Sequence, residues 1–150
     1  MKKMVFPLMF LKIMVEIKEI SAAETWQLRH KVMWPNKPLE FVILPNDEDG
    51  FHYGLFEKNR LISVISLFKN GKKGQFRKFA TDKDYQGKGY GAKLFIYLME
   101  AAKLLNISCL YCNARVSFIG FYEKFGMKLT SNITQKNEKG YVRMEIALNE

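Results

Sequence analysis

Six consecutive residues near the middle of the chain have the composition of a phosphate-binding loop, Gln86-Gly87-Lys88-Gly89-Tyr90-Gly91. Because glycine has no Cβ, the backbone N–H groups of such a loop stay uncovered. An amphipathic helix is predicted directly after it, over 92–105, and the positive end of a helix dipole favours an anion. The pattern therefore predicts a site that binds phosphate through the backbone, with a plain turn into the helix as the alternative.

Two other glycine-rich phosphate motifs do not fit this segment. A Walker loop requires Ser or Thr directly after its Gly-Lys pair, whereas Gly89 follows Gly87-Lys88. A dinucleotide-binding fingerprint requires Gly-x-Gly-x-x-Gly close to the first strand of its unit. Here the glycines alternate with single residues, and three predicted strands precede them in direct succession. Spacing therefore excludes both competing motifs.

The elements that position this loop follow from the hydrophobic periodicity of the chain. Ser21 and Glu24 have the spacing of a capping box that opens a helix, and Pro35 ends that helix. A second, short helix is predicted with Ser117 as its N-cap and Gly126 at its end. Strands are predicted at 14–20, 52–56, 61–68, 75–80, 107–112, 127–130 and 141–148, and helices at 92–105 and 118–125, with 41–44 either helical or extended.

The order of these elements predicts an α+β fold. Strand, helix and strand follow one another around the glycine loop, which favours a right-handed crossover between two parallel strands. The strands before and after this crossover are joined by short turns, as in antiparallel sheets. We therefore expect a mixed, mostly antiparallel sheet with a parallel segment in its middle.

Length and composition limit the classes of protein to which the chain can belong. At 150 residues, with 48% hydrophobic and 26% charged residues, we expect one compact domain over residues 14–150. The formal charge of +9 suggests an anionic partner, such as a phosphorylated cofactor, a nucleic acid or a membrane surface. The lysines are spread along the chain without tight interleaving of aromatic residues, so we do not expect a nucleic acid as the main partner.

The N-terminal residues and the cysteines indicate the compartment. The apolar run 4–11 is short and contains a proline, so residues 1–13 are expected to be an extension without an export function, with Met14 as an alternative start. No later stretch has the roughly 20 apolar residues of a membrane helix. Cys109 and Cys112 face opposite sides of a predicted strand, which disfavours a disulfide or a shared metal. A cytoplasmic location and no membrane partner are expected.

The order of the elements and two sequence motifs resemble the GNAT superfamily of acetyl-CoA-dependent N-acetyltransferases. Gln86, Gly89 and Gly91 match the Gln/Arg-x-x-Gly-x-Gly/Ala pattern of that family. The segments 113–115 and 120–127 are similar to the family's next strand end and the helix after it. The resemblance extends over nearly all of the chain from Met14 to Leu148. It implies a sheet splayed at its central parallel segment to hold coenzyme A, with helices on both faces.

The resemblance also implies which residues contact the acetyl-CoA co-substrate. No metal ion is expected. The backbone over 87–92 would hold the pyrophosphate, and the main chain of 79–81 would pair with the pantetheine amides, with ordinary strand pairing as the alternative. Asn113 would hydrogen-bond the pantetheine arm or simply end its strand. The predicted coenzyme contacts are Phe79, Ala80, Thr81, Gln86, Gly87, Lys88, Gly89, Tyr90, Gly91, Ala92 and Asn113.

Tyr122 is the predicted general acid, because the family often has a tyrosine at this position. Amine attack on the thioester gives a tetrahedral intermediate that must expel the coenzyme A thiolate. A phenol with an ordinary pKa of about 10 stays protonated at neutral pH and can donate to a departing sulfur whose thiol pKa is about 8.5. A core aromatic is the alternative, because the neighbouring Phe121 and Phe125 are packing residues.

The base and the acceptor pocket are expected in the first half of the chain. His52 begins a strand after an acidic turn and is the first candidate for the base, with a packed histidine or proton transfer to water as the alternatives. Trp26, Arg29 and Trp34 are predicted to bind the acceptor substrate. For Trp26 the alternative is a place in the core. Arg29 forms either a contact to an acceptor carboxylate or an internal ion pair.

Together with the resemblance, these residues predict an N-acetyltransferase that moves an acetyl group from acetyl-CoA to a primary amine by direct attack, as a monomer or homodimer. A small molecule is the favoured acceptor, and a protein N-terminus or lysine is the alternative. A non-catalytic module that senses coenzyme A and a basic nucleic-acid-binding protein are the rival functions. Thioester turnover with amines separates the first rival from an enzyme, and steeply salt-dependent affinity identifies the second.

Overall fold

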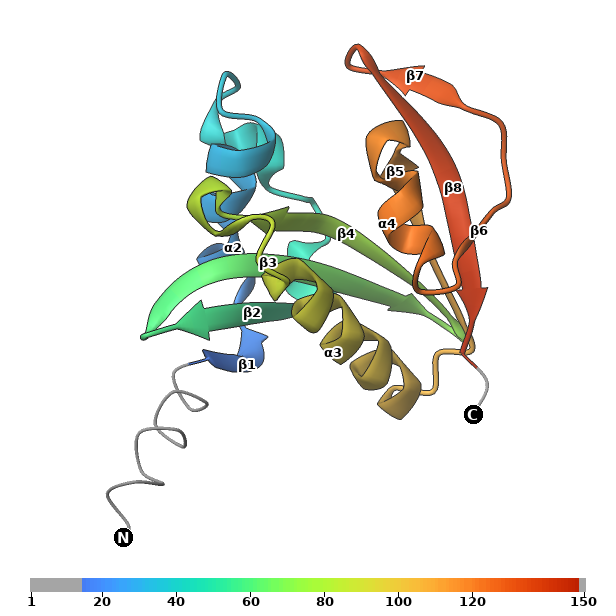
Figure 1. Ribbon diagram of the computed structural model, residues 1–150, viewed down its shortest axis with the longest axis horizontal. Helices are drawn as coiled ribbons and strands as arrows, with labels where there is room; N and C mark the ends of the chain where they lie inside the picture. The colour runs from blue at the N-terminus through green and yellow to red at the C-terminus, as the bar shows by residue number, and fades with distance from the viewer. Residues whose placement is uncertain (1–14, 149–150) are drawn as a thin grey trace, which may run out of the picture. The chain divides into compact units, whose positions relative to one another are not determined.

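The computed structural model describes residues 15–148, so the predictions for residues 1–13 and for Met14 lie outside the described part (Figure 1). Within it the chain forms two compact units, one of residues 15–66 and 78–98 and the other of residues 67–77 and 99–148. Two strands and one helix run through both units, namely β3 (Arg60–Asn70), β4 (Lys73–Thr81) and α3 (Tyr90–Leu104).

The strands form one mixed sheet. The other elements are β1 (Val15–Ile20), α2 (Ala22–Leu28), β2 (Phe51–Glu57), β5 (Cys109–Arg115), α4 (Ile119–Glu123), β6 (Lys128–Leu129), β7 (Thr134–Lys136) and β8 (Lys139–Ala147). The hydrogen-bonded strand order is β1-β2-β3-β4-β5-β8-β6, and β7 pairs with β8. The pairs β1–β2, β5–β8, β6–β8 and β7–β8 are antiparallel, whereas β4–β5 is parallel. The predicted fold class is therefore confirmed.

Helix α2 in the first unit begins at the predicted capping box. The Glu24 N–H donates to the Ser21 hydroxyl at 3.3 Å, and the Ser21 N–H donates to the Glu24 carboxylate at 2.8 Å. The helix passes into a π-helical turn, Arg29–Met33, and the helical backbone ends before Pro35. Both ends of this segment are thus determined by residues that the sequence analysis identifies.

The helices of the first unit cover opposite faces of the sheet. Phe79 of β4 stacks on Phe95 of α3, with ring centroids 6.0 Å apart. The next residue, Ala80, packs with Leu28 of α2 and Val64 of β3 in a buried cluster. Because successive residues of a strand point to opposite faces, α2 and α3 lie on opposite sides of β4. Helices on both faces of the sheet are thus confirmed.

In the second unit, β5 is paired with β8 along its whole length. On its other side β5 pairs with β4 in a parallel register that runs from Lys73 opposite Cys109 to Gln75 opposite Tyr111. These pairs involve the first three residues of each strand. The parallel contact is thus a short central segment of an otherwise antiparallel sheet, as predicted.

The entry into α4 differs from the prediction. A 3-10 turn over 116–118 precedes the helix, and its backbone hydrogen bond leads the chain directly into the first helical turn. Phe118 stands at the N-cap and forms no side-chain cap, so the predicted Ser117 cap is wrong. The C-terminal end is as predicted, because Gly126 has a φ of +94° and stops the helix.

Strand β7 lies between the predicted strands 127–130 and 141–148, where no strand is predicted. It forms a hairpin with β8 through Asn137 and Glu138, whose φ values are +51° and +65°. Two successive positive φ values are typical of a type I′ turn, which usually contains glycine. Residues 134–136 are all exposed, so the strand has no apolar alternation. Without glycine and without alternation, nothing local marks this hairpin.

The structure also bears on what composition suggests about disulfides, membrane helices and metal ions. Cys109 and Cys112 both carry free thiols. Among residues 15–148, none of the helices combines the length and the apolar content needed to span a bilayer. In the same range, His, Cys, Asp and Glu side chains form no group that is arranged to hold a metal ion.

Candidate active site

The glycine loop lies between the end of β4 and the start of α3, inside the first unit. A 3-10 turn, Lys83–Tyr85, leads into it, and the residues from Gln86 to Gly89 are exposed. The Lys93 N–H donates to the Gly89 carbonyl at 3.1 Å and opens the hydrogen-bond series of the helix. The N–H groups of 90–92 precede this bond and belong to the positive end of the helix. Backbone N–H donors at the positive end of a helix are groups to which an anion can bind.

The three glycines of the loop have different roles. Gly87 and Gly89 have φ values of +77° and +87°, which strongly favour glycine. At Gly91, which lies in α3, a Cβ would be 3.4 Å from Thr81 Oγ1 and 3.5 Å from Phe79 Cζ, and these are ordinary van der Waals distances. Backbone conformation therefore explains the first two glycines. The third position accepts a methyl group, consistent with the Gly/Ala choice of the family pattern.

Two side chains of the loop brace its ends. Gln86 Nε2 donates to the Thr81 carbonyl at 2.8 Å. The Tyr90 hydroxyl donates to the Glu57 carboxylate at 2.7 Å, and this hydrogen bond raises the pKa of the Tyr90 phenol. Both residues are predicted coenzyme contacts, and both use their side chains to hold the loop.

The end of β4 that is predicted to pair with pantetheine follows a backbone irregularity. Lys78 has a φ of +57°, a left-handed conformation that costs about 1 kcal/mol in a residue with a Cβ. Beyond it, the Ser63 hydroxyl donates to the Ala80 carbonyl at 3.3 Å and lies 2.8 Å from the Thr81 hydroxyl. These contacts fix the strand immediately before the glycine loop. The pairing of 79–81 with pantetheine stays a prediction.

In the second unit, the predicted general acid Tyr122 lies in α4 and is 6% exposed. Its ring centroid is 5.4 Å from that of Phe76. Burial raises the pKa of the Tyr122 phenol, so the hydroxyl keeps its proton at neutral pH. Asn113 lies exposed on β5, opposite Arg143 of β8. This unit therefore presents a buried phenol and an accessible amide.

Arg29 and Asp47 form a buried ion pair in the first unit. Arg29 is fully buried, and its two terminal nitrogens donate to the two Asp47 oxygens at 2.8 and 2.9 Å. Trp26 Nε1 and the Leu44 N–H each donate to the same carboxylate at 3.0 Å. Burial alone raises the pKa of Asp47, but the hydrogen bonds from Arg29, Leu44 and Trp26 outweigh it and hold the pKa below its ordinary value. Arg29 thus forms the internal ion pair of its two alternatives.

His52 lies buried beside this ion pair, and both of its ring nitrogens have partners. Nε2 is 2.8 Å from the Asp47 carbonyl, which only accepts, so this nitrogen carries a proton. Nδ1 is 2.7 Å from Ser66 Oγ, to which Arg29 Nη2 donates at 2.9 Å. In the neutral ring, Nδ1 accepts the Ser66 proton. His52 is therefore part of a buried hydrogen-bond network, and its role as a base stays a prediction.

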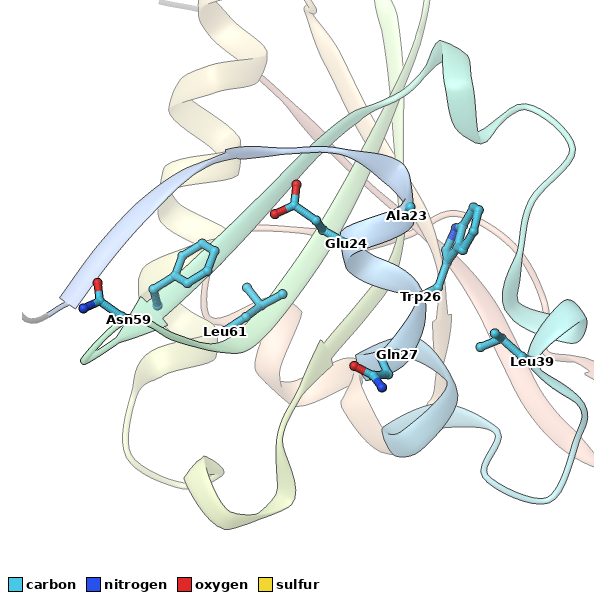
Figure 2. A pocket seen from close by; sticks show the side chains of 8 residues that line it. Ala23, Glu24, Trp26, Gln27, Leu39, Asn59 and Leu61 are labelled. Atoms are coloured by element: carbon cyan, nitrogen blue, oxygen red, sulfur yellow. The ribbon is translucent and has the colours of Figure 1, made fainter.

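An open cavity of about 500 Å³ lies beside α2 in the first unit. Figure 2 shows Glu24, Trp26 and Gln27 on α2, with Asn59 of the turn between β2 and β3 and Leu61 of β3 across from them. Trp34 packs instead against Phe41 in a T-shaped arrangement, with ring centroids 5.1 Å apart. Of the predicted acceptor residues, Trp26 thus lines a cavity, Arg29 is buried in an ion pair and Trp34 lies against Phe41. The lining residues are Ala23, Glu24, Trp26, Gln27, Leu39, Phe56, Asn59 and Leu61.

Sequence reasoning missed two serines that connect these groups. Ser63 and Ser66 interrupt the apolar strand β3, and both are fully buried. A buried hydroxyl requires a hydrogen-bond partner, so two serines in an apolar strand indicate polar neighbours on both faces of the sheet. Ser63 meets the end of β4, and Ser66 meets Arg29 and His52. This pattern was the available signal for the network.

Comparisons with known proteins agree with this architecture. Residues 17–148 match the family model described as the acetyltransferase (GNAT) domain. The uncharacterized N-acetyltransferase YitI of Bacillus subtilis strain 168 is 29% identical over 77% of this chain and 83% of its own. The ribosomal-protein-S18-alanine N-acetyltransferase of Escherichia coli has a TM-score of 0.78 at 14% identity, covering 91% of this chain and 96% of its own. A GNAT family acetyltransferase from Elizabethkingia anophelis with acetyl-CoA bound has a TM-score of 0.70 at 18% identity, covering 89% and 98%.

Proposed function

Because the chain belongs to the GNAT acetyltransferase family and is an acyltransferase, we propose that it transfers the acetyl group of acetyl-CoA to a primary amine. The glycine loop carries this proposal. Two glycines with positive φ open the backbone at the start of a helix of 15 residues. A diphosphate is the part of coenzyme A that such a helix start binds best, because N–H donors and the helix dipole act on the same anion.

The residues of the loop fit coenzyme A in shape as well as in charge. The exposed segment from Gln86 to Gly89 offers backbone without bulky cover at its two glycines. A Cβ at Gly87 or Gly89 would meet nothing within 4 Å, so the space over both positions is open to a ligand. We propose that backbone N–H groups over 87–92 hold the pyrophosphate, and that 79–81 and Asn113 contact the pantetheine arm.

Transfer in this proposal is direct. The amine nitrogen attacks the thioester carbonyl carbon, the C–S bond breaks, the nitrogen loses a proton and the sulfur gains one. A covalent route would need a reactive thiolate. Burial raises the pKa of Cys112 to about 12 and also raises that of Cys109, so neither thiol ionises readily at neutral pH. The two cysteines therefore favour direct attack.

The reaction includes two proton transfers, one to the sulfur and one from the amine, and each requires a side chain or solvent as the proton donor or acceptor. We assign the proton delivered to the departing sulfur to Tyr122, whose buried hydroxyl stays protonated. For the proton lost by the amine, His52 and water are the two candidates. His52 is 3% exposed, and its Nδ1 lies within hydrogen-bond distance of Ser66 Oγ at 2.7 Å, so it reaches an amine only if that hydrogen bond breaks. This geometry favours water.

The acceptor class is tested with a panel of amines. The proposal expects release of coenzyme A thiol from acetyl-CoA in the presence of some members of a panel that contains small amines, amino acids, and peptides with free N-termini or lysines. A response to small amines supports the favoured acceptor, whereas a response to peptides alone replaces it with a protein acceptor. If calorimetry detects binding of coenzyme A but no amine releases thiol, the chain is a sensor and the enzymatic proposal fails.

A further inference from the structure

Asp82 is a buried carboxylate at the junction between β4 and the glycine loop, and it is 2% exposed. Its N–H donates to the Ile62 carbonyl at 2.8 Å, which ties it to β3. Its Oδ1 accepts the Asp84 N–H at 3.0 Å, and its carbonyl accepts the Tyr85 N–H at 2.9 Å. Backbone and side chain of this residue together form the turn that leads into the loop.

Two cations from separate elements meet the other oxygen of this carboxylate. Lys31 of the π-helical turn places Nζ 3.1 Å from Asp82 Oδ2, and Arg60 at the start of β3 places Nη2 3.9 Å from it. The Lys31 and Arg60 side chains are 57% and 60% exposed, whereas that of Asp82 is 4% exposed. The hydrogen bond from the Asp84 N–H and the ammonium of Lys31 hold the pKa of Asp82 below its ordinary value. The carboxylate is thus charged at neutral pH.

The same cluster continues into the loop. Arg60 lies over the ring of Tyr85 at 5.7 Å, and Lys88 of the loop lies over the same ring at 5.8 Å. The Tyr85 ring in turn meets that of Tyr90, the first residue of α3, at 6.2 Å. Two cations that contact one aromatic ring therefore link the Asp82 turn to the residues proposed to bind the diphosphate.

We infer that Asp82 is a positioning residue that holds the glycine loop in its diphosphate-binding conformation without touching the ligand. This inference rests on the proposed function of the loop. It predicts a change in affinity for the anionic ligand that is opposite in sign to the change expected from electrostatic repulsion alone. A carboxylate close to an anion site repels the anion, so its removal alone should strengthen binding. If Asp82 positions the loop, its loss weakens binding instead.

Asp84 is the matched control for this test. It lies two positions along the same turn and is exposed, and its contact with Asp82 is made by its backbone N–H. Asp82→Asn removes the charge but keeps an oxygen that can accept the Asp84 N–H. Asp84→Asn removes an equal charge close to the same loop. Calorimetric titration of both purified variants and the wild type with coenzyme A compares the two effects.

We expect Asp82→Asn to raise the Kd for coenzyme A about tenfold, because small misplacement of binding groups has large effects. Asp84→Asn should leave the Kd unchanged or lower it. In the acetyl transfer assay, Asp82→Asn should raise the KM for acetyl-CoA and keep kcat at saturation. Lys31→Met should raise the Kd in the same direction, and adding it to Asp82→Asn should weaken binding little further.

The inference is overturned if Asp82→Asn binds coenzyme A as tightly as the wild type or more tightly. It is also overturned if Asp82→Asn lowers kcat and thermal stability together with no rise in KM, because that result describes a residue needed only for folding. A Lys31→Met variant with wild-type affinity contradicts the proposed link through the ion pair. Absence of binding by the wild type is a different outcome, since it removes the proposed function itself.

Discussion

At the scale of single residues, Tyr122 is buried and its hydroxyl stays protonated at neutral pH. Burial raises the pKa of its phenol, which keeps the hydroxyl protonated but also makes it a weaker acid than a free phenol. A thiol such as that of free cysteine has a pKa of about 8.5, below that of the phenol. We therefore expect Tyr122 to donate a hydrogen bond to the departing sulfur first and to deliver its proton only as negative charge develops there.

The substitution Tyr122→Phe tests this role. Loss of the hydroxyl should lower kcat by about 10²-fold, within the range that a positioned proton donor contributes, and should leave the affinity for acetyl-CoA nearly unchanged. Steady-state kinetics at saturating acetyl-CoA measure both quantities. Tyr53→Phe is the matched control, because Tyr53 is another buried phenol, at 5% exposure, with a pKa raised to about 12. An unchanged kcat in Tyr122→Phe removes this residue from the mechanism.

At the scale of elements, the start of α3 depends on backbone conformation more than on side-chain chemistry. Gly87 and Gly89 need positive φ, whereas Gly91 is in ordinary helical surroundings. A single Cβ therefore has different consequences at neighbouring glycines. Because an anion site of this kind is built from backbone N–H groups, a change in φ alters the site even where no side chain is lost.

The pair Gly89→Ala and Gly91→Ala separates these effects. Gly89→Ala forces a Cβ into a left-handed conformation at a cost of about 1 kcal/mol, so it should weaken coenzyme A binding roughly fivefold. Gly91→Ala should bind coenzyme A like the wild type, because its methyl group meets only ordinary contacts. Calorimetry on the two variants gives the comparison. Equal affinities would show that the φ of Gly89 does not matter to the site.

The π-helical turn that follows α2 is held to the segment around Asp47 by the buried ion pair of Arg29 and Asp47. Arg29→Met leaves the Asp47 carboxylate buried without its cation, which should lower the free energy of unfolding at pH 7 by roughly 3–5 kcal/mol. Lys18→Met is the control, because Lys18 and Glu16 form an exposed pair at 3.9 Å whose loss should change stability little. Urea unfolding curves measure both variants.

The pH dependence of this stability has a defined sign. The pKa of Asp47 is lowered in the folded protein from an ordinary value of 3.8, so its ion pair stabilises the fold above that pH. This contribution is lost as the pH falls through the lowered pKa. The difference in stability between the wild type and Arg29→Met should therefore shrink below about pH 4. A difference that stays constant into acid contradicts the role given to the Asp47 charge.

At the scale of the whole molecule, the formal charge of +9 acts on any anionic ligand at long range. Coenzyme A carries several negative phosphate charges, so its approach should be steered by this field and screened by salt. We expect the KM for acetyl-CoA to rise several-fold between about 50 and 300 mM potassium chloride, with kcat nearly constant. Initial rates at several salt concentrations test this, and a KM independent of salt would mean that only local contacts matter.

Much of the fold follows from short-range patterns in the chain. The capping box of Ser21 and Glu24, the helix stop at Gly126 and the glycine loop all depend on residues within a few positions of one another. The Ser117 cap failed because the backbone of the preceding turn leads into α4 without a side chain. Strand β7 was missed because Asn137 and Glu138 form a glycine-free turn. A local sequence pattern predicts a cap, a turn or a helix end correctly when the tertiary structure favours the same backbone conformation.

The amino-acid sequence by itself determined the order of the main elements, the glycine loop at the start of a helix and the family, because these depend on periodicity and on residues close together in the chain. Only the tertiary structure decided that Arg29 pairs with Asp47, that His52 faces Ser66 and that Asp82 gathers Lys31 and Arg60. A buried polar group needs a partner, but that partner comes from any segment that packing brings near. Spacing along the chain therefore shows that such a group needs a partner, and packing alone selects which one it has.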